Sequence, residues 1–298
     1  MINDTPFFTI VIPTYNRADF LPKTIKSLLA QTFANFEIIV VDDGSTDNTT
    51  EVMQAIQNQD ARVQYHLKKN EERAVARNTG AGKALGKYIN FFDSDDIAYP
   101  THLQLAYDTI QKIPNAEFFH LGYDVKTPEG EIISIVNNLP TQLNDALIFG
   151  NMLSCNGVFV RKDIALLYPF TTDRALSASE DYELWLRLAS RFTLYHQNEV
   201  TSTVVNHEMR SVLTINLEKL TQRLQLLEMY LEQDAMFVEK YKKHLRALKS
   251  NNCTYIALHL ALTKKNRLQT IKYLLKSLSI SLQVLRTRRF YATLKHFF

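Results

Sequence analysis

Three short clusters of acidic and polar residues occur in the first third of the chain, at 13–16 (PTYN), 42–45 (DDGS) and 93–96 (DSDD). Each cluster directly follows an apolar run that has the length of a buried strand. Ligands of open parallel sheets bind beyond the carboxyl ends of the strands, so we expect the clusters to share one edge of a sheet. Carboxylates brought so close repel one another, and a hard divalent cation with oxygen ligands would offset their charge.

Turn chemistry is an alternative for the second cluster, because Asp-Gly-Ser after a strand is a common turn that Asp43 would merely cap. The third cluster favours a functional role, since a turn does not need three carboxylates within four residues. The sequence has neither a GxGxxG fingerprint nor a GxxxxGKS/T loop. Dinucleotide-binding Rossmann folds and P-loop proteins therefore lose support.

Short apolar runs alternate with helical patterns between residues 7 and 125. Strands are expected at 7–12, 36–41, 62–67 and 88–92, and helices at 18–31, 48–59 and 71–85. This alternation predicts βαβ units, and hence an α/β fold with a mostly parallel sheet flanked by helices. The segment from 118 to 206 is less regular. It predicts short strands at 132–136, 157–160, 192–195 and 201–205, and a helix that begins near Ser179.

From Ile215 onward the sequence predicts helices. Apolar residues recur every three or four positions in two stripes, which are Leu217, Leu220, Leu224, Leu227 and Leu231, and then Leu268, Ile271, Leu275, Leu278, Leu282 and Leu285. Such stripes are typical of paired helices and would allow a dimer formed through the tail, so an oligomer is possible. Residues 277–282 also alternate as a strand does.

In this order, the segments resemble the family 2 glycosyltransferases, which have the GT-A fold. The resemblance spans residues 7–211 and is carried by TIVIPTYNR (9–17), VVDDGSTDNT (40–49), 70–86 with ARNTG at its centre, YINFFDSDD (88–96) and SEDYELWLR (179–187). It implies a GT-A catalytic domain over residues 1–213, followed by a basic helical region over residues 214–298. It also implies an inverting enzyme that moves a sugar from a nucleotide donor, most often a UDP-sugar, to a glycan or lipid-linked glycan acceptor.

The same resemblance implies a donor site and a metal ion. The donor-binding residues would be Pro13, Tyr15, Asp42, Asp43, Asn70, Arg77, Asp93 and Asp95. Tyr15 would stack on the base. Asp93 and Asp95 match the family's DXD motif, which binds Mn²⁺ or Mg²⁺, and His207 is a further candidate ligand. The metal would act as a Lewis acid on the leaving nucleoside diphosphate. A helix-surface charge for Arg77 and an ordinary surface role for His207 are the alternatives.

Glu180 and Asp181 match the family's ED motif, in which the Asp is the general base. An inverting transferase needs one carboxylate to take the proton of the acceptor hydroxyl. Asp181 would lie in the first turn of a helix capped by Ser179 or Ser177, where the helix dipole keeps a carboxylate ionised. The alternative is that both acids are simply favourable charges at a helix N-terminus. Trp185, one turn further on, is expected either beneath the acceptor sugar or in the core.

The composition is that of a globular protein, with 298 residues of which 46% are hydrophobic and 22% charged. Two cysteines, Cys155 and Cys253, are too few and too far apart for a disulfide scaffold or a Cys-based zinc site. The sequence has no basic leader and no run of ~18 apolar residues that would span a bilayer. A cytoplasmic location is therefore expected.

The charge is unevenly distributed along the chain. The formal net charge is only +3, yet 14 of the 34 Lys and Arg residues follow Glu239 and no Asp or Glu does. A basic amphipathic tail fits peripheral attachment to an anionic membrane, where each cation contributes about 1 kcal/mol. The candidate anchors are Phe290, Tyr291, Phe297 and Phe298. The alternative is a helical face that packs on the catalytic domain or on another subunit.

Two other classes of function are alternatives to a glycosyltransferase. A sugar nucleotidyltransferase shares the α/β plan but usually has a glycine-rich phosphate loop near its N-terminus, and residues 13–17 contain no Gly. A nucleic-acid-binding protein would use the basic tail and bind with a steep salt dependence. The sequence shows no RNA-binding aromatic motif and no DNA-reading helix signature, so a nucleic-acid partner is not expected.

Overall fold

The parallel half of the sheet is built from the apolar runs of the N-terminal third. In the computed structural model, which describes residues 5–207, 216–263 and 266–297, these strands lie in the order β3 (Val63–Leu67), β2 (Phe36–Asp42), β1 (Phe8–Thr14) and β4 (Tyr88–Phe91). Every residue of β1 and β2 is buried. This explains their uninterrupted apolar sequences, because strands of a parallel sheet are covered on both faces.

Three helices connect the parallel strands, as the sequence predicts. They are α1 (Leu21–Leu29), α2 (Thr49–Gln59) and α3 (Arg73–Lys83). Because β1 pairs in parallel with both β2 and β4, the loops that follow these strands leave the sheet at one edge. Thr14, the last residue of β1, lies opposite Asp42, the last residue of β2. The predicted meeting of the polar clusters at one edge is therefore confirmed.

The other half of the sheet is mixed. β8 (Val158–Arg161) pairs antiparallel with β4, and is followed by β6 (Phe118–Lys126), β9 (Leu194–Val205) and β5 (Ile97–Ala98), with β7 (Ile132–Val136) on β6. Over the described residues these strands form one nine-stranded sheet. The two strands expected at 192–195 and 201–205 are in fact the single strand β9.

Helices cover both faces of the sheet. They are α4 (His102–Lys112), the short α5 (Asn144–Leu147) and α6 (Lys162–Leu167), and α7 (Glu180–Arg191), with single 3₁₀ turns at η1 (Cys155–Gly157) and η2 (Arg174–Leu176). Alternate residues of β1 enter opposite cores: Val11 packs in the cluster of α7, and Ile10 in the cluster of α1 and α4. The parallel strands and α7 thus share one packed interior.

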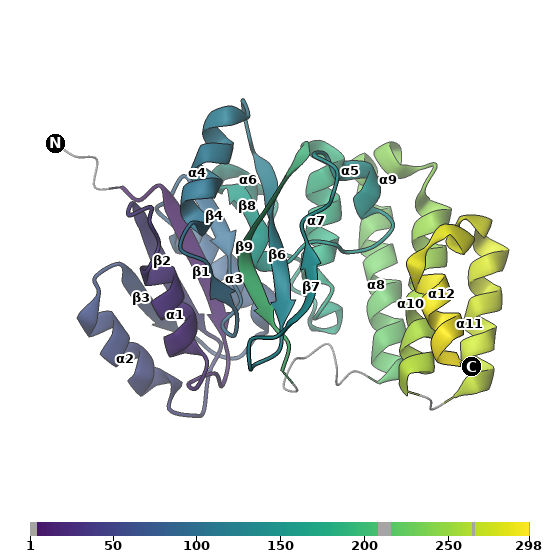
Figure 1. Cartoon of the computed structure of the whole chain (residues 1–298), viewed down its shortest axis with the longest axis horizontal. Helices are drawn as coiled ribbons and strands as arrows, with labels where there is room; N and C mark the ends of the chain where they lie inside the picture. The colour runs from purple at the N-terminus through teal and green to yellow at the C-terminus, as the bar shows by residue number, and fades with distance from the viewer. Residues whose placement is uncertain (1–4, 208–215, 264–265, 298) are drawn as a thin grey trace.

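The C-terminal helices stand beside the sheet domain (Figure 1). They are α8 (Leu217–Gln233), α9 (Ala235–Tyr241), α10 (Leu245–Thr263), α11 (Arg267–Ile280), η3 (Leu282–Arg286) and α12 (Arg288–Phe297). In the first leucine stripe, Leu220, Leu224, Leu227 and Leu231 are buried, in the same apolar cluster as Leu184 of α7. This part of the tail therefore packs on the catalytic domain. The proposed boundary between residues 213 and 214 lies outside the described residues and stays a prediction.

The second leucine stripe does not pack as the sequence suggested. Leu268, Leu275 and Leu282 are 81%, 62% and 69% exposed. Helix α11 instead turns its other side, with Leu274 and Ser277, toward α10, where Ser250 Oγ donates to the Ser277 carbonyl at 2.8 Å. Residues 277–280 belong to α11 rather than to a strand. Among the described residues, no helix has both the length and the apolar character needed to cross a bilayer.

Candidate active site

A cavity of about 610 Å³ opens where the loops after β1, β2 and β4 converge. Seven of the eight predicted donor-site residues line it, and the exception is Asp42. The seven are Pro13, Tyr15, Asp43, Asn70, Arg77, Asp93 and Asp95. The cavity is also lined by residues that the sequence did not single out, among them Arg17, Glu72 and Arg73. The sequence could have indicated these three residues, because all of them fall within the segments that resemble the family.

Asp42 shapes the loop after β2 instead of facing the cavity. Its side chain is fully buried and accepts hydrogen bonds from the Ser45 backbone N–H at 2.8 Å and from the Tyr65 hydroxyl at 2.7 Å. Gly44 follows in a left-handed conformation with φ of 81°, and a Cβ atom there would lie 3.0 Å from the Asn70 backbone nitrogen. Glycine is therefore needed both for the backbone angle and for the close approach of residue 70.

Asp43 holds the chain that leads into α3. Its carboxylate accepts hydrogen bonds from the Lys68 ammonium at 2.7 Å and from the backbone N–H groups of Glu71 and Glu72 at 2.9 and 2.8 Å. Glu72, the residue before α3, adopts φ of 79°, an angle that costs energy in any residue with a Cβ atom. The Asp43 contacts stabilise this bend, so Asp43 is more than the turn cap considered from the sequence.

Arg77 joins the clusters after β4 and at the start of α7. Its guanidinium is 2% exposed and donates to Glu180 Oε1 at 2.8 Å and to Asp93 Oδ1 at 2.9 Å. It also lies over the Phe170 ring, 5.2 Å from the ring centre. A surface charge is thereby excluded. A planar guanidinium with several fixed donors can hold two carboxylates at once, which a lysine cannot do with the same geometry.

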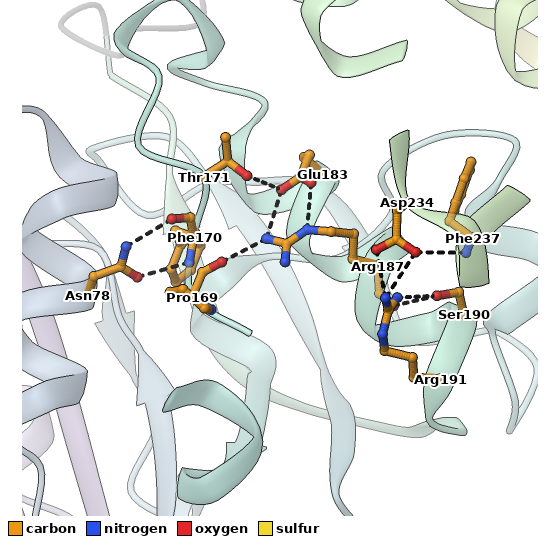
Figure 2. Close-up of polar contacts among 10 residues, drawn as sticks. All are labelled: Asn78, Pro169, Phe170, Thr171, Glu183, Arg187, Ser190, Arg191, Asp234 and Phe237. Atoms are coloured by element: carbon orange, nitrogen blue, oxygen red, sulfur yellow. Dashed lines mark hydrogen bonds and ion pairs between the residues drawn. The ribbon is translucent and has the colours of Figure 1, made fainter. Parts of the chain in front are cut away.

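Helix α7 is fixed from both sides (Figure 2). On the sheet side, the Asn78 side chain of α3 exchanges two hydrogen bonds of 2.9 Å with the backbone of Phe170. On the opposite side, Arg191 at the end of α7 pairs with Asp234, at the beginning of α9, at 2.8 Å. Arg187 of α7 donates to the carbonyl of Pro169, the residue before Phe170, at 2.7 Å, so α7 is tied to α3 on one side and to α9 on the other.

The two acids of the ED segment have opposite environments. Glu180 is buried, which alone would raise its pKa, but the guanidinium groups of Arg73 and Arg77 outweigh burial and lower that pKa. Burial and the neighbouring Glu180 charge raise the pKa of Asp181 to about 6. Asp181 Oδ2 accepts a hydrogen bond from the Asn151 amide at 3.2 Å. Asp181 is therefore the better proton acceptor of the two, and it is still ionised near neutral pH.

The expected serine cap of α7 is wrong, whereas Trp185 takes the core position, one of its two predicted alternatives. Ser179 occupies the N-cap position, but its hydroxyl makes no capping hydrogen bond, and the Ser177 hydroxyl lies 3.5 Å from Glu72. The acids of the first turn themselves complement the helix dipole. Trp185 has no exposed surface and packs against Phe118, with ring centres 5.7 Å apart, so it belongs to the core and not to an acceptor site.

The three carboxylates at 93–96 have different partners. Asp93 pairs with Arg77, as described above. Asp96 is buried, and its carboxylate accepts hydrogen bonds from the Asn156 side-chain amide at 2.7 Å and from the Val205 backbone N–H at 2.8 Å. Asp95 lines the cavity, and its Oδ2 atom lies 3.0 Å from His207 Nε2 and 3.7 Å from Arg17 Nε. Asp95 and His207 therefore come together as the sequence suggested, although they are far apart in the chain.

The donor set at Asp95 fits a divalent metal only in part. Within the residues that the structure describes, no three His, Cys, Asp or Glu side chains lie close enough to share one ion. One carboxylate oxygen and one imidazole nitrogen are nevertheless suitable ligands for Mn²⁺, and Mg²⁺ is commonly held by one or two carboxylates plus substrate phosphates. The residues present would therefore bind a metal mainly together with a diphosphate. Asp93 is occupied by Arg77, which makes it the weaker candidate ligand.

The sequence matches glycosyl transferase family 2 over residues 9–159, and the chain belongs to this family. Membership of this family favours glycosyl transfer over the nucleotidyltransferase and nucleic-acid-binding alternatives. An uncharacterized glycosyltransferase of Rickettsia conorii is 34% identical over 64% of this chain, which spans about a third (31%) of that relative. The putative teichuronic acid biosynthesis glycosyltransferase TuaG of Bacillus subtilis is 28% identical over 71% of this chain and 84% of its own length.

Solved structures share the fold along almost the whole chain. S. aureus TarS 1–349 in complex with UDP-GlcNAc has a TM-score of 0.66 at 18% identity, covering 97% of this chain and 88% of TarS 1–349. The mannosyltransferase PcManGT from Pyrobaculum calidifontis, in complex with GDP-Man and Mn²⁺, has a TM-score of 0.60 at 18% identity, covering 98% and 86%. The GT-A-type fold with a helical C-terminal region is confirmed.

Proposed function

We propose that this glycosyltransferase moves a sugar from a nucleotide donor, a UDP-sugar, to the hydroxyl of a glycan or lipid-linked glycan, with inversion at the transferred carbon. The observation that carries the proposal is the bridge from Asp93 through Arg77 to Glu180. This bridge places the donor cavity and the first turn of α7 on either side of one guanidinium. A base on α7 would then act at the sugar end of a donor bound in the cavity, although neither Glu180 nor Asp181 is among the residues that line it.

The nucleotide would bind at the loops after β1 and β2. Tyr15 is 47% exposed at the cavity, which leaves a ring face open for stacking on a base. Asn70 lines the same wall, held by a hydrogen bond of 2.7 Å from Arg174 to its side-chain oxygen. Asp43 would support this wall through its backbone contacts. Asp42 contributes only by shaping the loop. The proposed choice of UDP is supported by a TarS structure that holds UDP-GlcNAc.

The diphosphate would lie beside Asp95. Asp95 and His207 would hold Mn²⁺ or Mg²⁺, with Asp93 nearby, and the bound ion would neutralise charge on the departing nucleoside diphosphate. Arg17 and Arg73, which also line the cavity, place further positive charge where the phosphates would lie. The proposed use of a metal is supported by the PcManGT structure, which was solved in complex with GDP-Man and Mn²⁺.

Asp181 would be the general base. Its carboxylate takes the proton of the acceptor hydroxyl while the hydroxyl oxygen bonds to the anomeric carbon and the bond to the diphosphate breaks. Its pKa of about 6 leaves it ionised at neutral pH, yet makes it more basic than an ordinary Asp. Glu180 is the positioning residue, because its contact with Arg77 ties α7 to the donor side. Asn151 orients the Asp181 carboxylate.

A donor screen tests this function. Full-length protein is incubated with Mn²⁺ and a panel of nucleotide sugars, and the released nucleoside diphosphate is measured with and without glycan acceptors. We expect release from a UDP-sugar that depends on Mn²⁺ or Mg²⁺ and rises with acceptor. The matched control is Asp108→Asn on α4, which should release as much as the natural protein. Equal release with a metal chelator, or from GDP-sugars alone, would contradict the proposed metal or donor.

We place the enzyme on the cytoplasmic side of a membrane, with an acceptor carried on a membrane lipid. The basic tail supports this proposal, because no Asp or Glu follows Glu239. Cys155 and Cys253 are both free and buried, which suits a reducing compartment.

A further inference from the structure

The outer side of α11 is apolar. Leu268, Ile271 and Leu275 are 81%, 40% and 62% exposed, and their spacing of three and four residues places them on one side of the helix. We call these three residues the α11 face. The opposite side of the helix is buried, through Thr270, Leu274 and Ser277. Figure 1 places α11 at the end of the molecule that is farthest from the sheet.

An apolar outer side is unusual for a helix of a globular protein, which normally presents polar residues to water. The feature is not confined to one helix. Leu282 and Leu285 of η3, the next element, are 69% and 40% exposed. An exposed apolar patch of this kind marks an interaction surface.

Positive charge borders the α11 face. Lys272 and Lys276 are exposed, each one residue after a member of the face. Further positive charge lies on the other side of α11, where Arg267, Lys295 and His296 line a hollow of about 290 Å³ together with Thr270. The sequence has no Asp or Glu from residue 240 onward, although Glu228 of α8 lies close enough to interact with Lys276. The surface is thus both apolar and cationic.

The four aromatic residues that the sequence suggested as membrane anchors are not part of the α11 face, and those that the structure describes differ in exposure. Phe290 is buried, 7% exposed, in a small core with Leu274, so its proposed role as an anchor is wrong. Phe297 is partly buried, with the Arg267 guanidinium 5.8 Å from its ring centre. Phe298 lies outside the described residues. Tyr291 is 59% exposed and remains compatible with an interfacial position.

The charge decides between two kinds of partner. A second copy of the chain would bring the same cations to the interface, and like charges oppose association. A bilayer with anionic phospholipids matches both features, because apolar side chains enter the boundary of the acyl chains while Lys and Arg bind phosphates. We propose that the α11 face docks the protein on an anionic phospholipid bilayer, with Lys272 and Lys276 binding headgroup phosphates. The docking does not depend on the identity of donor, acceptor or base.

Vesicle sedimentation tests the proposal with the full chain. The variant Leu268→Gln/Ile271→Gln/Leu275→Gln removes the apolar character of the face and leaves its charge unchanged. The matched control Leu85→Gln/Leu166→Gln/Leu167→Gln changes three leucines of the catalytic domain that are 57%, 47% and 67% exposed. Vesicles of phosphatidylcholine with and without phosphatidylglycerol are used, and thermal unfolding checks that both variants fold.

We expect the natural protein and the control to bind vesicles with phosphatidylglycerol and not pure phosphatidylcholine. The α11-face variant should bind at least about tenfold more weakly. Lys272→Glu/Lys276→Glu should lose most of the dependence on phosphatidylglycerol. Equal binding by the α11-face variant, or no binding by the natural protein, overturns the proposal. A dimer in sedimentation equilibrium that only the α11-face variant dissociates, without vesicle binding, would assign the face to a second copy instead.

Discussion

Arg77 and Glu180 are 103 residues apart in the sequence, and their side chains meet at 2.8 Å in the buried floor of the site. The same guanidinium holds Asp93 at 2.9 Å. A single residue of α3 therefore connects the loop after β4 with the first turn of α7. Because the contacts are charged and buried, removing one partner leaves the other charges without compensation.

Arg77→Met should destabilise the protein strongly. Breaking a buried ion pair by removal of one partner costs about 3–5 kcal/mol of unfolding free energy. Urea unfolding measures the change. Arg62→Met is the matched control, because Arg62 pairs with Asp60 at 2.7 Å while both side chains stay partly exposed, and an exposed pair contributes about 0–1 kcal/mol. If both variants lose the same small amount, Arg77 does not hold the site together.

Gly44→Ala should weaken donor binding as well as stability. The residue needs φ of 81°, and the new Cβ atom would lie 3.0 Å from the Asn70 backbone nitrogen, so the Asn70 wall of the cavity must move. The cost is about 1–3 kcal/mol for the strained backbone. Gly130→Ala is the control, since its φ is 96° but no atom lies within 4 Å of the added Cβ. Isothermal titration with UDP should show weaker binding for Gly44→Ala only. An unchanged affinity in both variants would remove this loop from the donor site.

Asp95→Asn should raise the Mn²⁺ concentration needed for half-maximal activity, whereas Asp96→Asn should mainly lower stability. Asp95 faces the cavity beside His207, and Asp96 is buried with hydrogen bonds to Asn156 and Val205. Calorimetry of Mn²⁺ binding in the presence of UDP separates the two effects. His207→Asn should resemble Asp95→Asn in this titration. Metal affinity that depends on Asp96 and not on Asp95 would reverse the assignment.

The rate of transfer should fall in acid as Asp181 takes up a proton. The pKa of Asp181 is raised to about 6, so the ionised base predominates above that pH and is lost as the pH falls through it. We expect kcat to level off above about pH 7 and to fall about tenfold per pH unit well below 6. A profile of kcat measured from pH 5 to 8 checks this. A flat profile over that range would mean that no group with this pKa is required to be ionised.

The same pKa shift has a consequence for stability. The folded protein favours protonated Asp181, so its contribution to stability is present below the ordinary pKa of 3.8 and is lost as the pH rises through about 6. At pH 7.5, Asp181→Asn should therefore have an unfolding free energy about 1–3 kcal/mol higher than that of the natural protein, and a higher unfolding temperature. Asp108→Asn on α4 is the control. A less stable Asp181→Asn variant would contradict the environment described for this carboxylate.

The sheet edge was predictable because its signals are local. The apolar runs of β1, β2 and β4 identify the buried strands. The rules for parallel sheets then predict that the polar clusters after these strands lie at one edge. Strand β6 gave no such signal, because His120, Gly122 and Asp124 interrupt it. Gly122 is required where a Cβ atom would lie 2.8 Å from the Glu199 carbonyl oxygen of β9. Only the paired strand explains that residue.

The contacts inside the site were less predictable than its location. Nothing in the sequence pairs Arg77 with Glu180, since such a contact depends on the packing of α3 against α7. The stripe at 268–285 shows a different limit. Periodicity indicates that one side of a helix is apolar, but it does not tell whether protein covers that side. No part of the chain that the structure describes covers Leu268 and Leu275, which are largely exposed.

The role of Asp181 is tested most directly by comparing sugar transfer and donor binding in Asp181→Asn. The substitution keeps the shape of the side chain and its hydrogen-bonding capacity toward Asn151, but removes the proton acceptor. We predict that transfer from the UDP-sugar falls by about 10²–10⁴-fold, while the dissociation constant of UDP in the presence of Mn²⁺ stays within about twofold of the natural value. Transfer at nearly the natural rate by Asp181→Asn, with UDP bound normally, would contradict the account.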